Sequence, residues 1–373
     1  MSRILGLPRR VMLALVLGAV LAGLGISATG ALAKSGPRAV YTLTNGAAGN
    51  AVQVFDRAGG SLTPDGSFPT GGNGTGGGLG NQGGLILDGG ERLFAVNAGS
   101  DSISAFEVSR SGLQLVDTVG SGGDQPISLT AHRGLLYVLN AGGDGNINGF
   151  RYTRSGDLSP LAGSTRPLSG AAPGPAQVSF DPEGRTLVVT EKDTNLIDTY
   201  RVNRQTGLAS GPNPQASAGQ TPFGFAFDPR GHLIVSEAFG GAADQSAVSS
   251  YEVDDGIIDP ITPSAATTET AACWIVVTKD GRFAYTTNTG SNSISGYGIG
   301  GDGELSLLDA DGVTGATGPG PIDMALTQGD RFLFSLNSGD GTISGFHVGS
   351  DGSLTPVGGA GGLPTSANGL AAR

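Results

Sequence analysis

The sequence is poor in cysteine, histidine and tryptophan, and each shortage removes a class of function. It has one Cys, three His and one Trp in 373 residues. The single cysteine, Cys273, excludes an intramolecular disulfide, and the scattered histidines form no Cys/His cluster of the kind that holds zinc. We therefore expect no metal and no cofactor, and we expect packing alone to stabilise the fold.

Charge is also scarce, and its sign is unbalanced. Charged residues make up 14% of the chain, and the net charge is −11. Removal of an N-terminal segment with Arg3, Arg9 and Arg10 would take away three positive charges and change −11 to −14. An acidic chain is a poor partner for the phosphates of nucleic acid or for an anionic membrane surface. We expect neither as a partner.

Residues 1–33 have the order of a secretory signal peptide. Basic residues precede an apolar run from Val11 to Ile26, and Ala31-Leu32-Ala33 forms an A-x-A cleavage pattern. The run is short for a bilayer span, which needs about 20 residues. The alternative is an uncleaved anchor, and the Arg9-Arg10 pair leaves both general and twin-arginine export open. We expect residues 34–373 to be a secreted or periplasmic monomer.

Glycine is abundant, and it separates the apolar runs of a repeat. The 67 glycines lie between short apolar runs, a composition that indicates many turns and strands. One strand pattern recurs seven times at intervals of 43 to 52 residues, typically after a strand that begins with Pro and before a glycine-rich turn and an alternating strand. The repeats end at Asn45, Asn97, Asn140, Glu191, Glu237, Asn288 and Asn337. The pattern predicts an all-β fold, a seven-bladed β-propeller formed by residues 34–373.

The ends of the repeat predict how the ring closes. Tyr41 opens the first blade with no innermost strand before it, whereas Pro364–Leu370 has the pattern of an innermost strand with nothing after it. We expect the C-terminal strand to complete the first blade.

Several segments also carry a family resemblance. Gly174–Arg185, Leu187–Glu191 and Tyr285–Tyr297 resemble the lactonase family of seven-bladed β-propellers, which includes 6-phosphogluconolactonase and 3-carboxymuconate cyclase-type enzymes. The resemblance covers essentially the whole chain after residue 33 and implies a lactone-opening carboxylic-ester hydrolase. Catalytic members usually carry His in a Pro-His-Gln-like motif, where this sequence has Pro175-Ala176-Gln177. A histidine-based mechanism therefore does not carry over, since a fold does not fix its site chemistry.

Two carboxylates break the repeat where it otherwise ends in Asn. Glu191 and Glu237 end second strands in neighbouring blades, on the face that we expect to surround the channel mouth. Two crowded carboxylates can form a general acid/base pair, because repulsion raises one pKa toward neutrality. The alternative is that each Glu only replaces Asn in a hydrogen bond to the following turn.

Three innermost-strand residues are candidates for ligand binding. Gln177 and Asp323 occupy matching positions, and Asp323 should face the channel or pair with a neighbour because it is a charge in an apolar strand. Trp274 could stack on a sugar or lactone, or could fill the core. The glycine-rich stretch from Gly71 to Gly84 lacks a phosphate-loop ending and is interpreted as a long inter-blade loop.

Three functions remain open on this evidence. The first is an exported lactonase in which Glu191 and Glu237 are catalytic and Gln177, Trp274 and Asp323 bind a small sugar or carboxy-lactone. The second is a non-catalytic exported propeller that binds a ligand or protein at the same place, which the missing histidine favours. The third is a structural surface protein with no small-molecule site.

The signal-peptide interpretation gives a direct prediction. Expression with the native N-terminus should release a chain that begins at Lys34, because the A-x-A pattern ends at Ala33. Intact-mass measurement of the exported protein checks this. Recovery of the full-length chain in the membrane fraction would support the anchor instead.

Overall fold

The computed structural model describes residues 38–109 and 112–373. The signal-peptide prediction for residues 1–33 lies outside these ranges. Within them, no helix is long and apolar enough to cross a membrane. The one helical segment in the described part of the chain is the 3-10 turn η1 (Phe239–Gly241).

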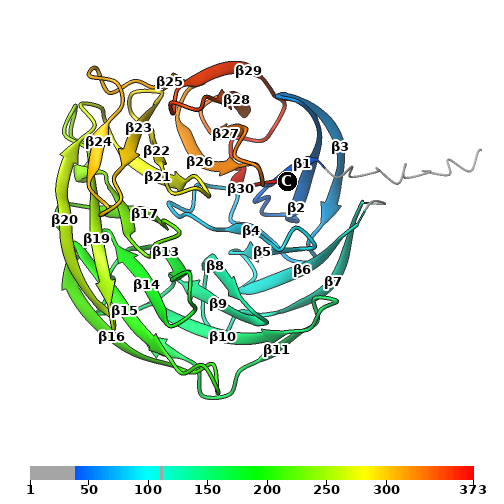
Figure 1. Cartoon of the computed structure of the whole chain (residues 1–373). Coiled ribbons are helices and arrows are strands. Elements are labelled where there is room, and N and C mark those ends of the chain that lie inside the picture. The colour runs from blue at the N-terminus through cyan, green and yellow to red at the C-terminus, as the bar shows by residue number, and fades with distance from the viewer. Residues whose placement is uncertain (1–37, 110–111) are drawn as a thin grey trace, which may run out of the picture. The chain divides into compact units, whose positions relative to one another are not determined.

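The described residues form seven antiparallel sheets arranged as blades around an axis (Figure 1). The innermost strands, for blades 1 to 7, are β30 (Asn368–Ala372), β4 (Leu85–Asp88), β8 (Pro126–His132), β13 (Pro175–Phe180), β17 (Pro222–Phe227), β21 (Ala272–Val277) and β26 (Pro321–Leu326). The second strands are β1 (Ala39–Leu43), β5 (Arg92–Asn97), β9 (Leu135–Asn140), β14 (Thr186–Glu191), β18 (Leu233–Glu237), β22 (Phe283–Asn288) and β27 (Phe332–Asn337).

The outer half of each blade contains two further strands. The third strands are β2 (Ala51–Ala58), β6 (Ser102–Ser109), β10 (Asn146–Tyr152), β15 (Leu196–Val202), β19 (Ala247–Asp254), β23 (Ser293–Ile299) and β28 (Thr342–Val348). The outermost strands are β3 (Ser61–Pro69), β7 (Gly112–Gly120), β11 (Leu158–Pro160), β16 (Ala209–Ala216), β20 (Ile257–Ala266), β24 (Leu305–Leu307) and β29 (Leu354–Ala360), and the short β12 (Arg166–Pro167) and β25 (Gly315–Ala316) pair with β10 and β23.

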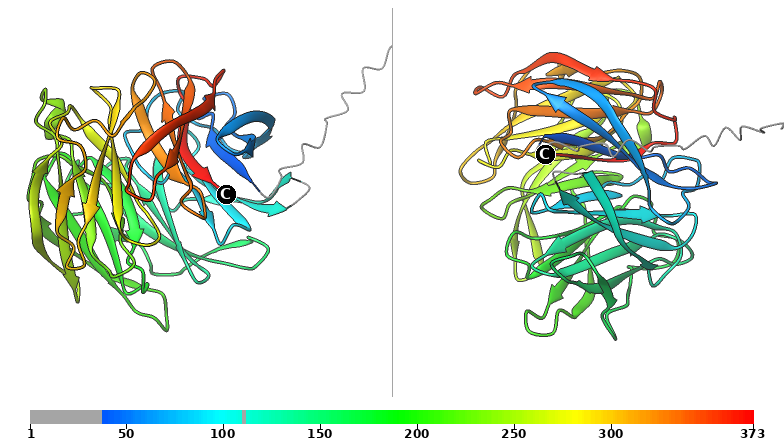
Figure 2. Two further views of the ribbon diagram at one scale, coloured as in Figure 1. Left: turned by 45° about the horizontal axis from the view of Figure 1, so that its top comes forward. Right: turned by 90° about the vertical axis from the view of Figure 1, so that its right-hand side faces the viewer.

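The predicted seven-bladed propeller and its closure are confirmed. β30 pairs with β1, with Tyr41 opposite Ala371, and so the C-terminal strand completes blade 1. Figure 2 shows this red strand beside the blue N-terminal strands. The strand starts at Asn368, later than the predicted Pro364, because the residues just before it form a turn in which Ser366 Oγ donates to the carbonyl of Thr44 at 2.8 Å.

Burial follows the position of each strand in its blade. All residues of the second strand β14 are buried, whereas most of the outermost β16 is exposed or half-buried. Second strands have neighbours on both faces and therefore read as continuous apolar runs. Apolar clusters fill the gaps between adjacent blades, such as the cluster that joins Tyr137 of blade 3 to Leu187 of blade 4. These interfaces hold the ring together without a disulfide.

Buried tyrosines connect adjacent blades by hydrogen bonds as well as by apolar packing. The hydroxyl of Tyr137 donates to the carbonyl of Gly207 at 2.9 Å, and that of Tyr285 donates to Gly352 at 2.8 Å. Each bond runs from a second strand to an outer turn of the next blade. A buried hydroxyl needs such a partner.

The two faces of the ring differ in what they present to the axis. We call the face where second strands end in Asn or Glu the Asn face. We call the opposite face, with the turns between first and second strands such as Asp181–Arg185 and Thr327–Arg331, the hairpin face. Bulges recur near the start of innermost strands, for example at Ala176 and Asp323, and so alter side-chain direction close to the Asn face.

Candidate active site on the propeller axis

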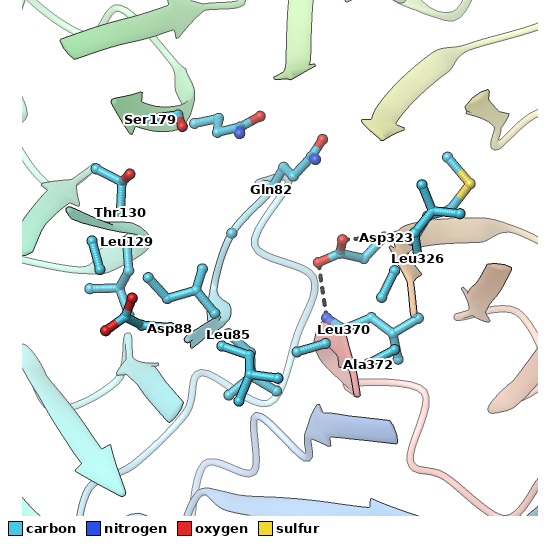
Figure 3. Close-up of a pocket in the computed structure, with 18 of the residues that line it drawn as sticks. Gln82, Leu85, Asp88, Leu129, Thr130, Ser179, Asp323, Leu326, Leu370 and Ala372 are labelled. Atoms are coloured by element: carbon cyan, nitrogen blue, oxygen red, sulfur yellow. Dashed lines mark hydrogen bonds between the residues drawn. The ribbon is translucent and has the colours of Figure 1, made fainter. Parts of the chain in front are cut away.

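A cavity of about 390 Å³ lies on the axis, with walls from innermost strands of five blades. Its polar lining includes Asp323, Gln177, Thr130 and Ser179, and leucine, valine and alanine side chains form most of the rest (Figure 3). A second compartment of about 480 Å³ adjoins it between β13, β17, β21 and β26. Both compartments include Gln82 in their walls. The exposed lining of the first compartment is mainly polar, whereas that of the second is mainly apolar, and small-molecule sites use polar groups to orient a ligand and apolar groups to bury it.

Asp323 is the buried carboxyl group of this cavity, which the half-buried Asp88 also lines at the hairpin face. Asp323 is the bulge residue of β26, with a φ of 43°, and its side chain points toward β30 (Figure 3). Its two oxygens accept backbone N–H bonds from Met324 at 2.9 Å and Leu370 at 3.2 Å. The side chain thus meets both sequence expectations, since it lines the channel and bonds to the neighbouring blade.

Burial controls the protonation of this carboxyl. Asp323 is 3% exposed, and loss of solvation raises its pKa to about 7, although the two backbone N–H groups lower it. A carboxyl with a pKa near neutrality can accept and return a proton at physiological pH.

Gln177 lines both compartments, and its side-chain amide is hydrogen-bonded to the backbone of the wall. Its amide nitrogen donates to the carbonyl of Phe225 at 3.0 Å, and its amide oxygen accepts the Phe225 N–H at 2.7 Å. This pairing joins blade 4 to blade 5. The second proton of the amide is the part of Gln177 that a ligand can use.

Thr130 adds a hydroxyl to the same cavity (Figure 3). Its oxygen accepts the Phe180 N–H at 3.1 Å, which leaves the hydroxyl proton as a donor. Sequence reasoning did not select Thr130, because its partner lies on the next blade, 50 residues away.

Trp274 belongs to the core on the axis. It is 5% exposed, its ring lies 4.8 Å from that of Phe223, and its indole N–H donates to the carbonyl of Asn81 at 2.7 Å. Of its two sequence interpretations, core filling matches this geometry. Cys273 beside it is buried, and burial raises the pKa of its thiol to about 12, so it packs as a protonated thiol.

The structure does not bring Glu191 and Glu237 together. Glu191 is fully buried and accepts bonds from the Ser169 N–H at 3.0 Å and the Thr194 hydroxyl at 2.7 Å. Glu237 accepts the Gly219 N–H at 2.8 Å and the Ser264 hydroxyl at 2.7 Å. The two carboxylates share no partner, and neither lines the axial compartments.

The same position in the other blades shows which residue these two carboxylates replace. In several other blades, the Asn at the same position bonds to the following strand, as Asn97 does to Ser104 at 2.8 Å and Asn288 to Ser295 at 2.9 Å. Glu191 makes one bond of the kind offered as the alternative to catalysis, from Thr194 in the following turn. Gly219 and Ser264, which bond to Glu237, lie outside the turn that follows it. The role of the two carboxylates as an acid/base pair stays a prediction, without support from this geometry.

Glu191 instead faces a second buried acid, Asp198 on β15. Burial and the adjacent Glu191 carboxylate raise the pKa of Asp198 well above its ordinary range. Two carboxyls in contact are stable when they share one proton. This pair lies beside Ser169, in the connection from blade 3 to blade 4, and concerns the stability of the ring.

The channel is filled from the Asn face by residues Gly80–Gly83, which we call the axial plug. The Asn81 carbonyl accepts from Trp274, and the Asn81 side-chain oxygen accepts the Asn368 amide at 2.9 Å. The Gln82 N–H donates to Ala176 at 3.1 Å, and the Gly83 carbonyl accepts the Leu129 N–H at 2.9 Å. The plug therefore contacts innermost strands of blades 1, 3, 4 and 6.

The axial compartments lie on the hairpin-face side of the plug. The channel mouth was expected on the Asn face, but the two compartments lie between Gln82 and hairpin-face residues such as Asp88 and Asp330. The inter-blade loop predicted from Gly71 to Gly84 is present, and its last residues form this plug. The one sequence signal for it is the polar pair Asn81-Gln82 between glycines.

No group of three or more His, Cys, Asp or Glu side chains in residues 38–109 and 112–373 could hold a metal ion. His232 is 7% exposed, and its Nδ1 lies 2.9 Å from Asp228 Oδ2 in the turn after β17.

Comparison with known proteins identifies the family. The profile of the lactonase family of seven-bladed β-propellers matches residues 84–366. The chain belongs to this family. A sequence comparison with curated proteins found no match.

Solved structures agree on the fold at low sequence identity. A Lactobacillus plantarum protein has a TM-score of 0.72 at 18% identity, covering 90% of this chain and 99% of its own. A candidate 6-phosphogluconolactonase from Bacteroides fragilis has a TM-score of 0.70 at 19% identity, with 90% and 98% covered. The periplasmic gluconolactonase PpgL of Pseudomonas aeruginosa has 0.65 at 17%, with 89% and 99% covered.

The buried acid pair gives a prediction for stability. The raised pKa of Asp198 means that the folded state holds a proton that the unfolded state releases above about pH 4. Its contribution to stability is present at low pH and is lost as the pH rises. We expect Asp198→Asn, which needs no proton, to melt at least about 2 °C higher relative to wild type at pH 8.5 than at pH 5.

Differential scanning calorimetry at both pH values checks this prediction. Asp144→Asn is the control, because Asp144 is exposed in a turn. An equal Asp198→Asn difference at the two pH values would contradict the shared proton.

Proposed function

We propose that this protein is an exported lactonase that opens a small, uncharged lactone in the axial cavity. The observation that carries the proposal is the buried Asp323 carboxyl on the wall of a cavity of about 390 Å³. The family supports lactone chemistry, and the N-terminal pattern together with a periplasmic relative supports export. The carboxylate favours an uncharged ring, because an anion beside it would be repelled.

Lactone hydrolysis needs a base that later acts as an acid. Water adds to the ring carbonyl carbon, the ring C–O bond breaks, and the departing oxygen takes a proton. The Asp323 carboxylate accepts the proton of the attacking water and returns it to the ring oxygen. The Met324 and Leu370 N–H groups each bond one oxygen and hold the carboxylate in place.

Donors on the same wall can stabilise the negative charge that develops on the carbonyl oxygen. The Thr130 hydroxyl and the second amide proton of Gln177 are the groups available on this surface. Both are fixed by bonds to the backbone, which limits reorganisation during the reaction.

Non-catalytic binding is the second candidate. Ala176 stands where family members carry His, and Asp323 has no second titratable side chain among its direct hydrogen-bond partners in the described chain. This function would use the same cavity. It differs in having saturable lactone binding without turnover.

The pH dependence and one substitution test the lactonase. A base with a pKa of about 7 predicts that kcat/KM rises about tenfold per pH unit below pH 7 and levels off above it. Asp323→Asn should lower kcat by about 100-fold or more. Hydrolysis of δ-gluconolactone and γ-butyrolactone in a pH-stat, corrected for the uncatalysed rate, measures both.

Three further variants make the test specific. Asp340→Asn changes an exposed acid on the Asn face and should retain full activity. Glu191→Gln and Glu237→Gln, if folded, should retain activity. A large loss of activity in either variant would indicate that these carboxylates take part in catalysis. Binding without turnover in the wild type would favour the second candidate.

A further inference from the structure

The side chain of Gln82 stands between the two axial compartments. It comes from the plug and lies between the strands that carry Ser179 and Asp323 (Figure 3). Its amide nitrogen donates to the Ile275 carbonyl at 2.7 Å, and its amide oxygen accepts the Ile275 N–H at 3.0 Å. Gln82 is therefore held in one position on the axis by the backbone of β21.

Gly224 provides the room for this amide. A Cβ atom at Gly224 would lie 2.0 Å from the Gln82 side-chain oxygen and 2.6 Å from the Cys273 carbonyl. An alanine there would displace the amide or the strand. The glycine in β17 and the glutamine in the plug thus form one arrangement, although 142 residues separate them.

The compartments on either side of Gln82 differ in chemistry. The first contains Asp323. The second is lined largely by apolar side chains, including Ala226, Phe227 and Val277. A ligand with its ring beside Asp323 and a long alkyl chain toward β21 would need the space that the Gln82 amide occupies.

We propose that Gln82 is a specificity-determining residue that limits the axial site to compact lactones and excludes those with a long alkyl chain. The inference rests on the proposed function and names its substrate class. Gln82 acts by occupying space, because its two bonds to Ile275 hold the amide in one position on the axis. Its removal would join the two compartments and give an alkyl chain an apolar wall to contact.

The experiment compares lactones that differ only in chain length. Wild type and Gln82→Ala are assayed with γ-butyrolactone, γ-octalactone and γ-dodecalactone. We expect kcat/KM for γ-dodecalactone to rise about tenfold or more in Gln82→Ala, because each buried methylene adds binding energy, while γ-butyrolactone changes about threefold or less. Gln205→Ala, in an exposed turn, is the matched control and should retain the wild-type profile.

Two measurements distinguish a change in the size limit of the site from a loss of folding and from a loss of catalysis. Trp274 is the only tryptophan, and it bonds to the plug, so its emission and acrylamide quenching report whether the plug stays in place. Equilibrium dialysis of the same lactones measures binding without turnover. If no variant hydrolyses a lactone but Gln82→Ala binds γ-dodecalactone about tenfold more tightly, lactonase activity is excluded and the size limit stands.

Gly224→Ala provides a second test that keeps the glutamine. It should displace the amide and move the chain-length profile in the same direction as Gln82→Ala. If Gln82→Ala does not fold, Gly224→Ala alone decides. An unchanged ratio between γ-dodecalactone and γ-butyrolactone, in binding and in hydrolysis, in the folded variants would overturn the proposal.

Discussion

Closure of the ring by the pairing of β30 with β1 is the constraint on which the rest of the structure depends. With seven blades fixed in a circle, the innermost strands cannot move closer together to fill the axis. The space between them must hold side chains, other backbone or a ligand. This chain uses the first two on the Asn face, through Trp274 and the plug, and leaves compartments toward the hairpin face.

The blade pattern could be predicted because its determinants are local. Asn97 and Ser104 lie in one hairpin, and proline marks the start of several innermost strands. The same local pattern revealed Glu191 and Glu237 as exceptions. It could not reveal what they contact, because Ser169 and Gly219 belong to connections between blades.

The site itself depends on contacts across the ring. Gln82 and Ile275 are 193 residues apart, and Asn81 and Asn368 are 287 apart. No periodicity links such pairs, and glycine-rich loops look alike in sequence whether they lie on the surface or in a channel. Asp323 was recognised because a charge in an apolar strand requires an explanation wherever its partner lies.

One consequence concerns how the ring is held shut. β30 is bound on one side by β1 and on the other by the Asp323 carboxyl, through the Leu370 N–H. Hydrogen bonds to an ionised carboxylate are about twice as strong as those to a neutral carboxyl. Loss of the proton from Asp323 therefore strengthens this one bond, but burial raises the pKa of Asp323 to about 7, so the charge costs more in lost solvation than the bond returns. The ionisation that makes this residue a base therefore strengthens one bond to the last strand while it lowers the stability of the whole fold.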